Sequence, residues 1–405
     1  MEKSKVYIVD SKRSAIGKFL GSLYECDASD VCVQVLDGLF ASHPEIKGDV
    51  DEVVIGNVVS AGLGQGIARK IAVNSGIPMN VPAYSVNMVC GSGMQAIINA
   101  YKSILCGNRV ELCGGLEFMS NIPYATDSYV RLGKKFGDFK MMDLMVHDGL
   151  TDSFSGVHMG ITAENIAKDL DISREEQDKY SYYSQQRAIK AVDDGSFKDE
   201  IVPVKLKDWK NRGYVFDTDE FINRGTSLEK LASLKPSFIK DETGTITAGT
   251  ASGINDGASF LILADESYCA EHRIETSIEL VATASVGCDP QKMGLGPYYA
   301  IKKLLNETGV AFSDIDVLEI NEAFAAQTLG CYKLMAAEYD TTVEAIIDKC
   351  NLYGSGLGLG HPLGATGARI VTTLMHYMLS HDVKYGIASL CIGGGQGTAV
   401  LLKKK

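Results

Sequence analysis

Two segments of the chain carry the same order of local signals, and this duplication constrains the fold more than any other feature. In the first half, an apolar stretch after Asp51 precedes a glycine-rich turn at residues 90–96. In the second half, a similar stretch after Asp316 precedes a glycine-rich turn at residues 360–367. Each turn is followed by another apolar run that ends in glycines. Strands that alternate with a helix in this way are typical of a layered α/β domain.

The two halves differ in the residue that precedes the expected helix. The first half has Cys90 at this place, and the second half has His361. A duplicated fold related by a pseudo-twofold axis would bring both residues to one central site. A thiol beside an imidazole is a nucleophile with its base.

We therefore predict an α/β fold of duplicated α/β/α layers, with two pseudo-twofold-related halves and an inserted loop domain. Residues 1–120 and 250–272 form the predicted first half, and residues 273–405 form the second. Residues 121–249 are more polar and form the predicted insertion. Within it, the pattern predicts an amphipathic helix from the N-cap Ser173 to about Val192.

Composition excludes several other classes of protein. The chain has 405 residues, of which 45% are apolar, so it can bury a large core. It has no apolar run long enough for a membrane span and no signal-peptide core, which predicts a cytoplasmic protein. The ten cysteines form no C-x-x-C pair and are expected to be reduced thiols rather than metal ligands. A net charge of −12 argues against nucleic acid or an anionic membrane as a partner.

Four residues at expected helix starts or strand ends are candidates for chemistry. Cys90 lies where helix N–H groups and the positive end of the helix dipole would stabilise a thiolate. His361 is a candidate general base, and Cys391 begins a glycine-rich run whose backbone could line a pocket. Asn321 follows an apolar strand, where α/β sheets place ligand contacts. Each position also has a structural alternative: inert thiol, hydrogen-bonded histidine, tight turn and helix cap, respectively.

The chain resembles the thiolases along essentially its whole length. Four motifs carry the resemblance, in the same order as in the family: residues 87–93, 321–325, 359–369 and 391–397. The resemblance implies two stacked α/β halves with a loop domain, coenzyme A thioester substrates and a homo-oligomer, usually a homotetramer. Under this resemblance the insertion would provide coenzyme A binding and oligomer contacts.

The resemblance also assigns catalytic roles. Cys90, deprotonated by His361, would attack the acyl-CoA carbonyl and form an acyl-enzyme. Cys391 would then remove a proton from the methyl group of a second acetyl-CoA. His361, with a water held by Asn321, would stabilise the enolate, and the backbone N–H groups of Cys90 and Gly393 would stabilise the tetrahedral intermediate.

Other residues match the family at substrate-binding positions. They are Leu150, His158, Met159, Arg224, Ser252, Met293 and Phe324. The pair His158–Met159 resembles members whose acyl pocket admits little beyond an acetoacetyl group. Residues 353–360 depart from the usual family sequence, which predicts an altered pocket floor and a shifted acyl preference. Arg224 is displaced from the usual position of the arginine near the adenine.

The predicted reaction is the reversible condensation of two acetyl-CoA to acetoacetyl-CoA and CoA. Acetyl-CoA, acetoacetyl-CoA and CoA are therefore the expected partners, and CoA is a substrate or product and not a cofactor. The alternatives are a 3-ketoacyl-CoA thiolase of β-oxidation, a ketoacyl-carrier-protein synthase, which the motif at Cys391 disfavours, and a non-catalytic acyl-CoA-binding scaffold. A reversible Cys90–Cys391 disulfide is a further prediction about regulation.

Overall fold

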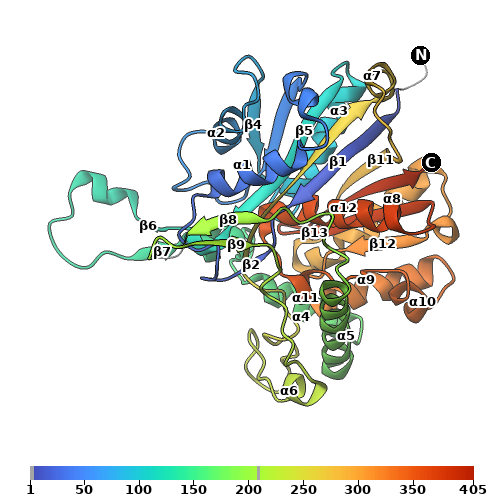
Figure 1. The fold of residues 1–405 in the computed structure, drawn as a ribbon. Helices are drawn as coiled ribbons and strands as arrows, with labels where there is room; N and C mark the ends of the chain where they lie inside the picture. Colours follow the sequence, from blue (N-terminus) through green and yellow to red (C-terminus); the bar gives the residue numbers. More distant parts are fainter. Residues whose placement is uncertain (1–3, 208–209) are drawn as a thin grey trace.

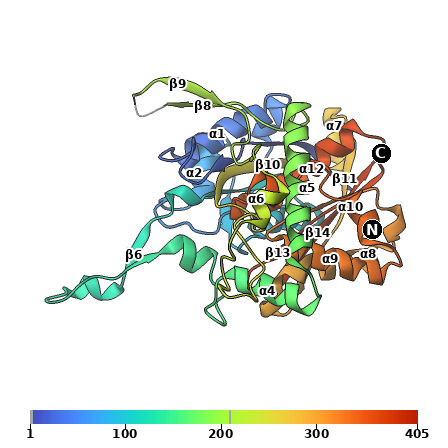
Figure 2. The same ribbon diagram turned by 90° about the horizontal axis from the view of Figure 1, so that it is seen from below.

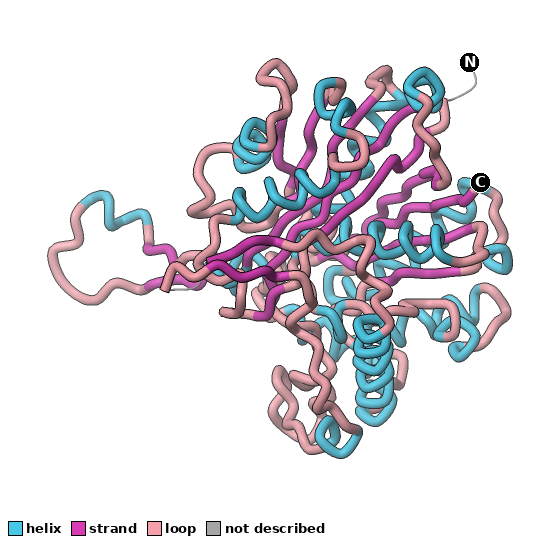
Figure 3. The backbone as a smooth tube through the Cα atoms, viewed as in Figure 1, coloured by secondary structure: helices cyan, strands magenta, loops and turns pink. Residues whose placement is uncertain are grey.

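A single ten-stranded sheet forms the framework of the protein in a computed structural model that describes residues 4–207 and 210–405 (Figure 1). The strands from the first half are β1 (Val6–Arg13), β2 (Gly17–Lys18), β3 (Glu52–Gly56), β4 (Ala83–Val86), β5 (Val110–Phe118) and β10 (Asn255–Asp265). Those from the second half are β11 (Ile278–Gly287), β12 (Val317–Ile320), β13 (Tyr385–Ile392) and β14 (Gln396–Lys404). Figure 3 shows the strands running through the centre of the molecule between layers of helices. The predicted α/β class is therefore confirmed.

The strand order repeats about the middle of the sheet, as a duplicated fold requires. The order is β12-β13-β14-β11-β1-β10-β5-β3-β4, with β2 beside β10. In the first half β3 is parallel to both β4 and β5, and in the second half β12 is parallel to β13, whereas the other pairings in the sheet are antiparallel. The halves meet where β1 pairs with β11, so they share one sheet.

Asp51 and Asp316 occupy equivalent positions in the two halves, each just before a strand that has a parallel neighbour. The Asp51 carboxylate accepts hydrogen bonds from the backbone N–H groups of Arg109 and Val110, just before β5. The Asp316 carboxylate accepts from the N–H groups of Lys384 and Tyr385, just before β13. Each aspartate therefore ties the start of one parallel strand to the start of its neighbour.

Two helices that begin beside the predicted catalytic residues pack against each other. They are α3 (Ser92–Leu105) and α12 (Leu363–Ser380), and their apolar side chains share one core with both halves of the sheet. Their close approach requires glycine: a Cβ on Gly93 would lie 2.7 Å from the Gly364 carbonyl oxygen. The packing brings the N-termini of both helices to the centre of the molecule.

The outer helices cover the opposite surface of each half. In the first half, α1 (Ala28–Leu39) and α2 (Ile67–Asn74) share a core with the side chains of β3, β5 and β10 that point away from α3. In the second half, α8 (Gly296–Thr308) and α9 (Ala325–Glu338) do the same against β13 and β14. Alternate strand residues therefore contact different helix layers.

The predicted insertion contains a projecting hairpin and several helices (Figures 1 and 2). The hairpin pairs β6 (Tyr124–Thr126) with β7 (Met141–Asp143), and a second pair joins β8 (Val204–Lys207) to β9 (Gly213–Phe216). The helices are α4 (Met159–Asp169), α5 (Arg174–Asp193) and α6 (Leu228–Ala232). The predicted N-cap of α5 is confirmed, because Ser173 and Glu176 form a reciprocal capping box. Among the described residues, no helix is both long and apolar enough to span a bilayer.

Candidate active site

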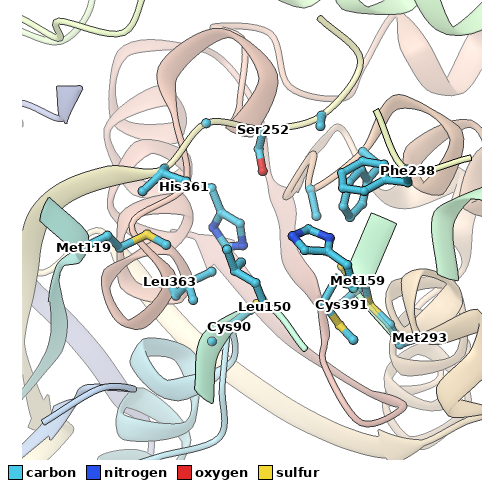
Figure 4. A pocket seen from close by; sticks show the side chains of 17 residues that line it. Cys90, Met119, Leu150, Met159, Phe238, Ser252, Met293, His361, Leu363 and Cys391 are labelled. Atoms are coloured by element: carbon cyan, nitrogen blue, oxygen red, sulfur yellow. The ribbon is translucent and has the colours of Figure 1, made fainter. Parts of the chain in front are cut away.

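One largely apolar pocket collects residues from both halves and from the insertion (Figure 4). The sequence-predicted residues that line it are Cys90, Leu150, His158, Met159, Ser252, Met293, Phe324, His361 and Cys391. The lining also includes Met119, Phe238 and Leu363, which the sequence analysis did not single out. No motif marks the first two, whereas Leu363 lies within the motif at residues 359–369.

Cys90 lies in a tight turn immediately before α3. The preceding Val89 has a φ of 47°, a left-handed conformation that is costly for a β-branched residue. The Ser92 hydroxyl holds this turn, because it accepts a hydrogen bond from the Met88 N–H and donates one to the Val89 carbonyl. The backbone strain is consistent with a turn that presents the thiol to the pocket.

The backbone N–H groups at this turn do favour a Cys90 thiolate, but they are not the largest influence on the pKa of the thiol. Burial raises the pKa of this thiol to about 11, and it outweighs the opposing hydrogen bonds from the backbone N–H groups of Gly393 and Cys90. The Cys90 thiol is therefore neutral at rest and would need a base in order to act as a nucleophile.

The hydrogen bonds of His361 define which ring nitrogen can act as that base. The Thr366 hydroxyl donates to the Pro362 carbonyl, at 2.8 Å, so its oxygen accepts from the His361 Nδ1–H, at 2.7 Å. This arrangement leaves Nε2 as the acceptor. Burial, with a contribution from Arg369, lowers the pKa of His361 to about 3, so the ring is neutral at physiological pH. The Asn255 side chain also accepts from the His361 backbone N–H.

We expect the Thr366→Val substitution to lower kcat by about tenfold or more, because the imidazole would lose the acceptor that selects its tautomer. Steady-state thiolysis assays would measure the effect. Thr372→Val is the matched control, since Thr372 is a buried threonine on the same helix whose hydroxyl contacts Ser259 and not His361. Equal kcat values for the two variants would contradict this role of Thr366.

Asn321 and Cys391 complete the centre of the site. The Asn321 Nδ2 lies 3.4 Å from the His361 Nε2, and its Oδ1 is buried without a hydrogen-bond partner among the described residues. An unpaired buried amide oxygen of this kind can hold a water. Burial, and after it the nearby Cys90, raises the pKa of Cys391 well above its usual range. Both cysteines are free thiols here, and the proposed disulfide between them stays a prediction.

Arg224 lies outside this pocket. It lines an adjoining hollow with Lys18, Phe221 and other residues, and only Ile254 lines both spaces. Its guanidinium group donates two hydrogen bonds to the Asp193 carboxylate, at 3.0 and 2.6 Å.

The unusual stretch 353–360 also lies elsewhere, so the prediction that it forms the pocket floor is wrong. None of its residues lines the pocket of Cys90. It packs instead against α5 and α12: a Cβ on Gly358 would lie 2.9 Å from the Ala188 Cβ, and the Ser355 hydroxyl accepts a hydrogen bond from Arg369. The unusual stretch therefore lies where α5 and α12 pack against it.

Comparison with known proteins agrees with this geometry. The family description "Thiolase, N-terminal domain" matches residues 6–267, and "Thiolase, C-terminal domain" matches residues 274–404. The chain is 42% identical to an acetyl-CoA acetyltransferase of Allochromatium vinosum, covering 98% of this chain and 99% of that protein. It is 43% identical to a probable acetyl-CoA acyltransferase of Staphylococcus aureus, covering 99% of both.

Solved structures give the same result. The crystal structure of the Bacillus anthracis acetyl-CoA acetyltransferase matches with a TM-score of 0.93 and 39% identity, covering 100% of this chain and 99% of that one. That of human mitochondrial 3-ketoacyl-CoA thiolase matches with a TM-score of 0.93 and 38% identity, covering 100% of both. The chain belongs to the thiolase family, as its motifs predicted. It is an acyltransferase enzyme, and the names of its relatives divide between acetyl-CoA acetyltransferase on one side and acetyl-CoA acyltransferase or 3-ketoacyl-CoA thiolase on the other.

Proposed function

We propose that this thiolase is an acetyl-CoA C-acetyltransferase, which condenses two acetyl-CoA molecules reversibly into acetoacetyl-CoA and CoA. The observation that carries the proposal is the pocket in which Cys90, His361 and Cys391 meet. Its volume of about 210 Å³ is smaller than the roughly 300–1,000 Å³ typical of ligand pockets, which favours a short acyl group.

The first half of the proposed reaction transfers an acetyl group to the enzyme. The His361 Nε2 takes the Cys90 proton while Sγ attacks the thioester carbonyl. The backbone N–H groups of Cys90 and Gly393 donate to the oxyanion of the tetrahedral intermediate. The intermediate then expels the CoA thiolate, which takes the proton of the Cys391 thiol and leaves as CoA. The products are acetyl-Cys90, a protonated His361 and a Cys391 thiolate.

The second half forms the carbon–carbon bond. The Cys391 thiolate removes a methyl proton from the second acetyl-CoA, and the high pKa of this buried thiol makes its thiolate a strong base. The protonated His361 and a water on Asn321 donate to the enolate oxygen. The enolate carbon then attacks acetyl-Cys90, and the departing Cys90 thiolate recovers its proton from His361. All three side chains return to their starting states.

Coenzyme A is the proposed common ligand of both half-reactions. A solved structure of human mitochondrial 3-ketoacyl-CoA thiolase, 39% identical to this chain with a TM-score of 0.91, is a complex with CoA. In this chain, hollows lined by residues 221–234 and 248–251 adjoin the pocket and share Ala251 and Ile254 with it. They offer space for the rest of a thioester whose acyl end lies at Cys90.

The proposed homotetramer has support from the projecting hairpin. Four large apolar side chains between β6 and β7 are more than half exposed: Tyr129 at 71%, Leu132 at 82%, Phe136 at 90% and Phe139 at 55%. Apolar side chains that gather on a projecting segment are typical of an interaction surface. The edge strand β4 offers a second surface on which a partner could add a strand.

Relative rates on substrates of different length test the proposed specificity. We expect kcat/KM for thiolysis to be about tenfold or more higher on acetoacetyl-CoA than on 3-ketodecanoyl-CoA, because the longer chain exceeds the cavity. Spectrophotometric assays of both substrates, beside acetyl-CoA condensation, would measure this. A preference for the longer substrate would support the alternative, a 3-ketoacyl-CoA thiolase, for which the human relative is the precedent.

A further inference from the structure

Glu117 is a buried carboxyl group with an unusual set of partners. It lies near the end of β5 and is 1% exposed. Its two oxygens accept four hydrogen bonds: from the backbone N–H groups of Val58, Val59 and Gly364, at 2.9, 3.1 and 3.0 Å, and from the Asn57 side chain, at 3.2 Å. Neither the sequence motifs nor the proposed reaction uses this residue.

The four donors come from opposite halves of the duplicated fold. Residues 57–59 form the turn after β3, whereas Gly364 belongs to the first turn of α12, three residues after His361. The contact leaves no room for a side chain, since a Cβ on Gly364 would lie 2.4 Å from the Leu116 carbonyl oxygen and 2.6 Å from the Glu117 Oε2. The Glu117 carboxyl group therefore connects the turn at residues 57–59 to the first turn of α12 by accepting backbone hydrogen bonds from both.

The segments that Glu117 joins pack beside Cys90, and one of them supplies Leu363 to the wall of the pocket. Val58, Val59, Met119 and Leu363 form one apolar cluster, and Cys90 packs against it. Any shift of α12 relative to β5 would move Leu363 and the neighbouring His361 against the thiol. Displacements of about 1 Å at reacting groups can cost about a hundredfold in rate.

The negative charge of Glu117 also affects the pKa of the Cys90 thiol. Burial, together with a smaller contribution from Asp256 on β10, raises the pKa of Glu117 to about 7 against the opposing N–H donors. Asp256 is itself buried, accepts a hydrogen bond from the Ser120 N–H, and has a pKa raised to about 6 by burial. The Glu117 carboxylate contributes, after burial, to the raised pKa of the Cys90 thiol.

We propose that Glu117 is a positioning residue for acyl transfer, which joins the turn after β3 to the N-terminus of α12 and thereby sets the placement of His361 against Cys90. The inference rests on the proposed function. Glutamine keeps the shape of the side chain but has one acceptor oxygen. Two of the four donors would then face an NH₂ group, and the N-terminus of α12 would lose its anchor.

The test compares Glu117→Gln with Glu111→Gln. Glu111 is a matched control because it is a buried glutamate on the same strand, hydrogen-bonded to Asn108 away from the pocket. We expect Glu117→Gln to lower kcat for thiolysis by about tenfold or more, with KM for CoA within about twofold. Glu111→Gln should keep kcat within about twofold of the unmodified protein.

A second readout separates positioning from simple loss of stability. Alkylation of Cys90 by iodoacetamide, followed by mass spectrometry over a range of pH, reports the ionisation of the thiol without any CoA substrate. Because the negative carboxylate is removed, we expect the midpoint of this profile to move to lower pH in Glu117→Gln and to stay unchanged in Glu111→Gln. The conservative Glu117→Asp keeps the charge and should keep the midpoint, but its shorter reach should still lower kcat.

Unchanged kcat in Glu117→Gln would overturn the inference. So would a kcat loss that Glu111→Gln reproduces at the same fall in melting temperature, or an alkylation profile that does not move. If Glu117→Gln yields no folded protein, the test rests on Glu117→Asp. A kcat of Glu117→Asp equal to that of the unmodified protein would then reject the positioning role. A failure of the proposed function would give a different result: the protein would still accept an acetyl group after Cys90 is replaced.

Discussion

Replacing Cys90 with serine is expected to lower acetyl transfer to the protein and thiolysis of acetoacetyl-CoA by at least about a thousandfold. A serine hydroxyl is far less acidic than a thiol. The His361 imidazole would therefore take a proton from a serine hydroxyl far less readily than from the Cys90 thiol. Incubation with radiolabelled acetyl-CoA, acid precipitation and peptide mapping would measure the covalent intermediate.

Cys106→Ser provides the control, because Cys106 is an exposed thiol at the other end of α3. It should label as fully as the unmodified protein. Persistent labelling of Cys90→Ser, or a label that maps to another residue in the unmodified protein, would show that the nucleophile has been assigned wrongly.

The second large effect is expected on the free energy of unfolding when Arg13 is replaced. Arg13 forms a buried ion cluster with Glu200 and Asp219, which joins the insertion to the sheet. Arg13 on β1 is fully buried and donates to the Glu200 carboxylate at 2.5 Å. It also donates two hydrogen bonds to Asp219, at 2.7 and 2.9 Å. Replacing Arg13 with methionine would leave two buried carboxylates without their cation, and we expect a loss of about 3–5 kcal/mol in the free energy of unfolding.

Urea denaturation at one fixed protein concentration would measure this loss, since assembly also affects apparent stability. Arg109→Met is the matched control. Arg109 forms an ion pair with Glu271 at 2.7 Å, but the two side chains are 42% and 62% exposed, so we expect a much smaller loss of stability than for Arg13→Met. Similar losses for the two variants would contradict the structural role of the Arg13 cluster.

Local patterns in the sequence were sufficient to predict much of the framework. The alternation of apolar runs with glycine-rich turns predicted the duplicated halves, and the equivalent aspartates Asp51 and Asp316 do occupy the same corner in each. The start of α5 at Ser173 follows from a capping box that spans only four residues. Such features depend on neighbours in the chain, which is why a single sequence reveals them.

Long-range neighbours were not predictable in the same way. Phe238 stacks on His158 with ring centroids 4.7 Å apart, although 79 intervening residues carry no signal of the contact. The four donors to Glu117 come from segments on both sides of it in the sequence and as far away as α12. Residues 353–360 were expected in the pocket because they adjoin His361, yet the chain turns them toward α5.

The amino-acid sequence alone determined that a cysteine and a histidine precede equivalent helices, because helix starts and strand ends depend on a few neighbouring residues. Only the folded protein decided how acidic those groups are. Both groups lose water to an enclosure built from distant segments, so the pKa of the thiol rises to about 11 and that of the imidazole falls to about 3. Desolvation depends on every atom that surrounds a group, whichever part of the chain supplies it.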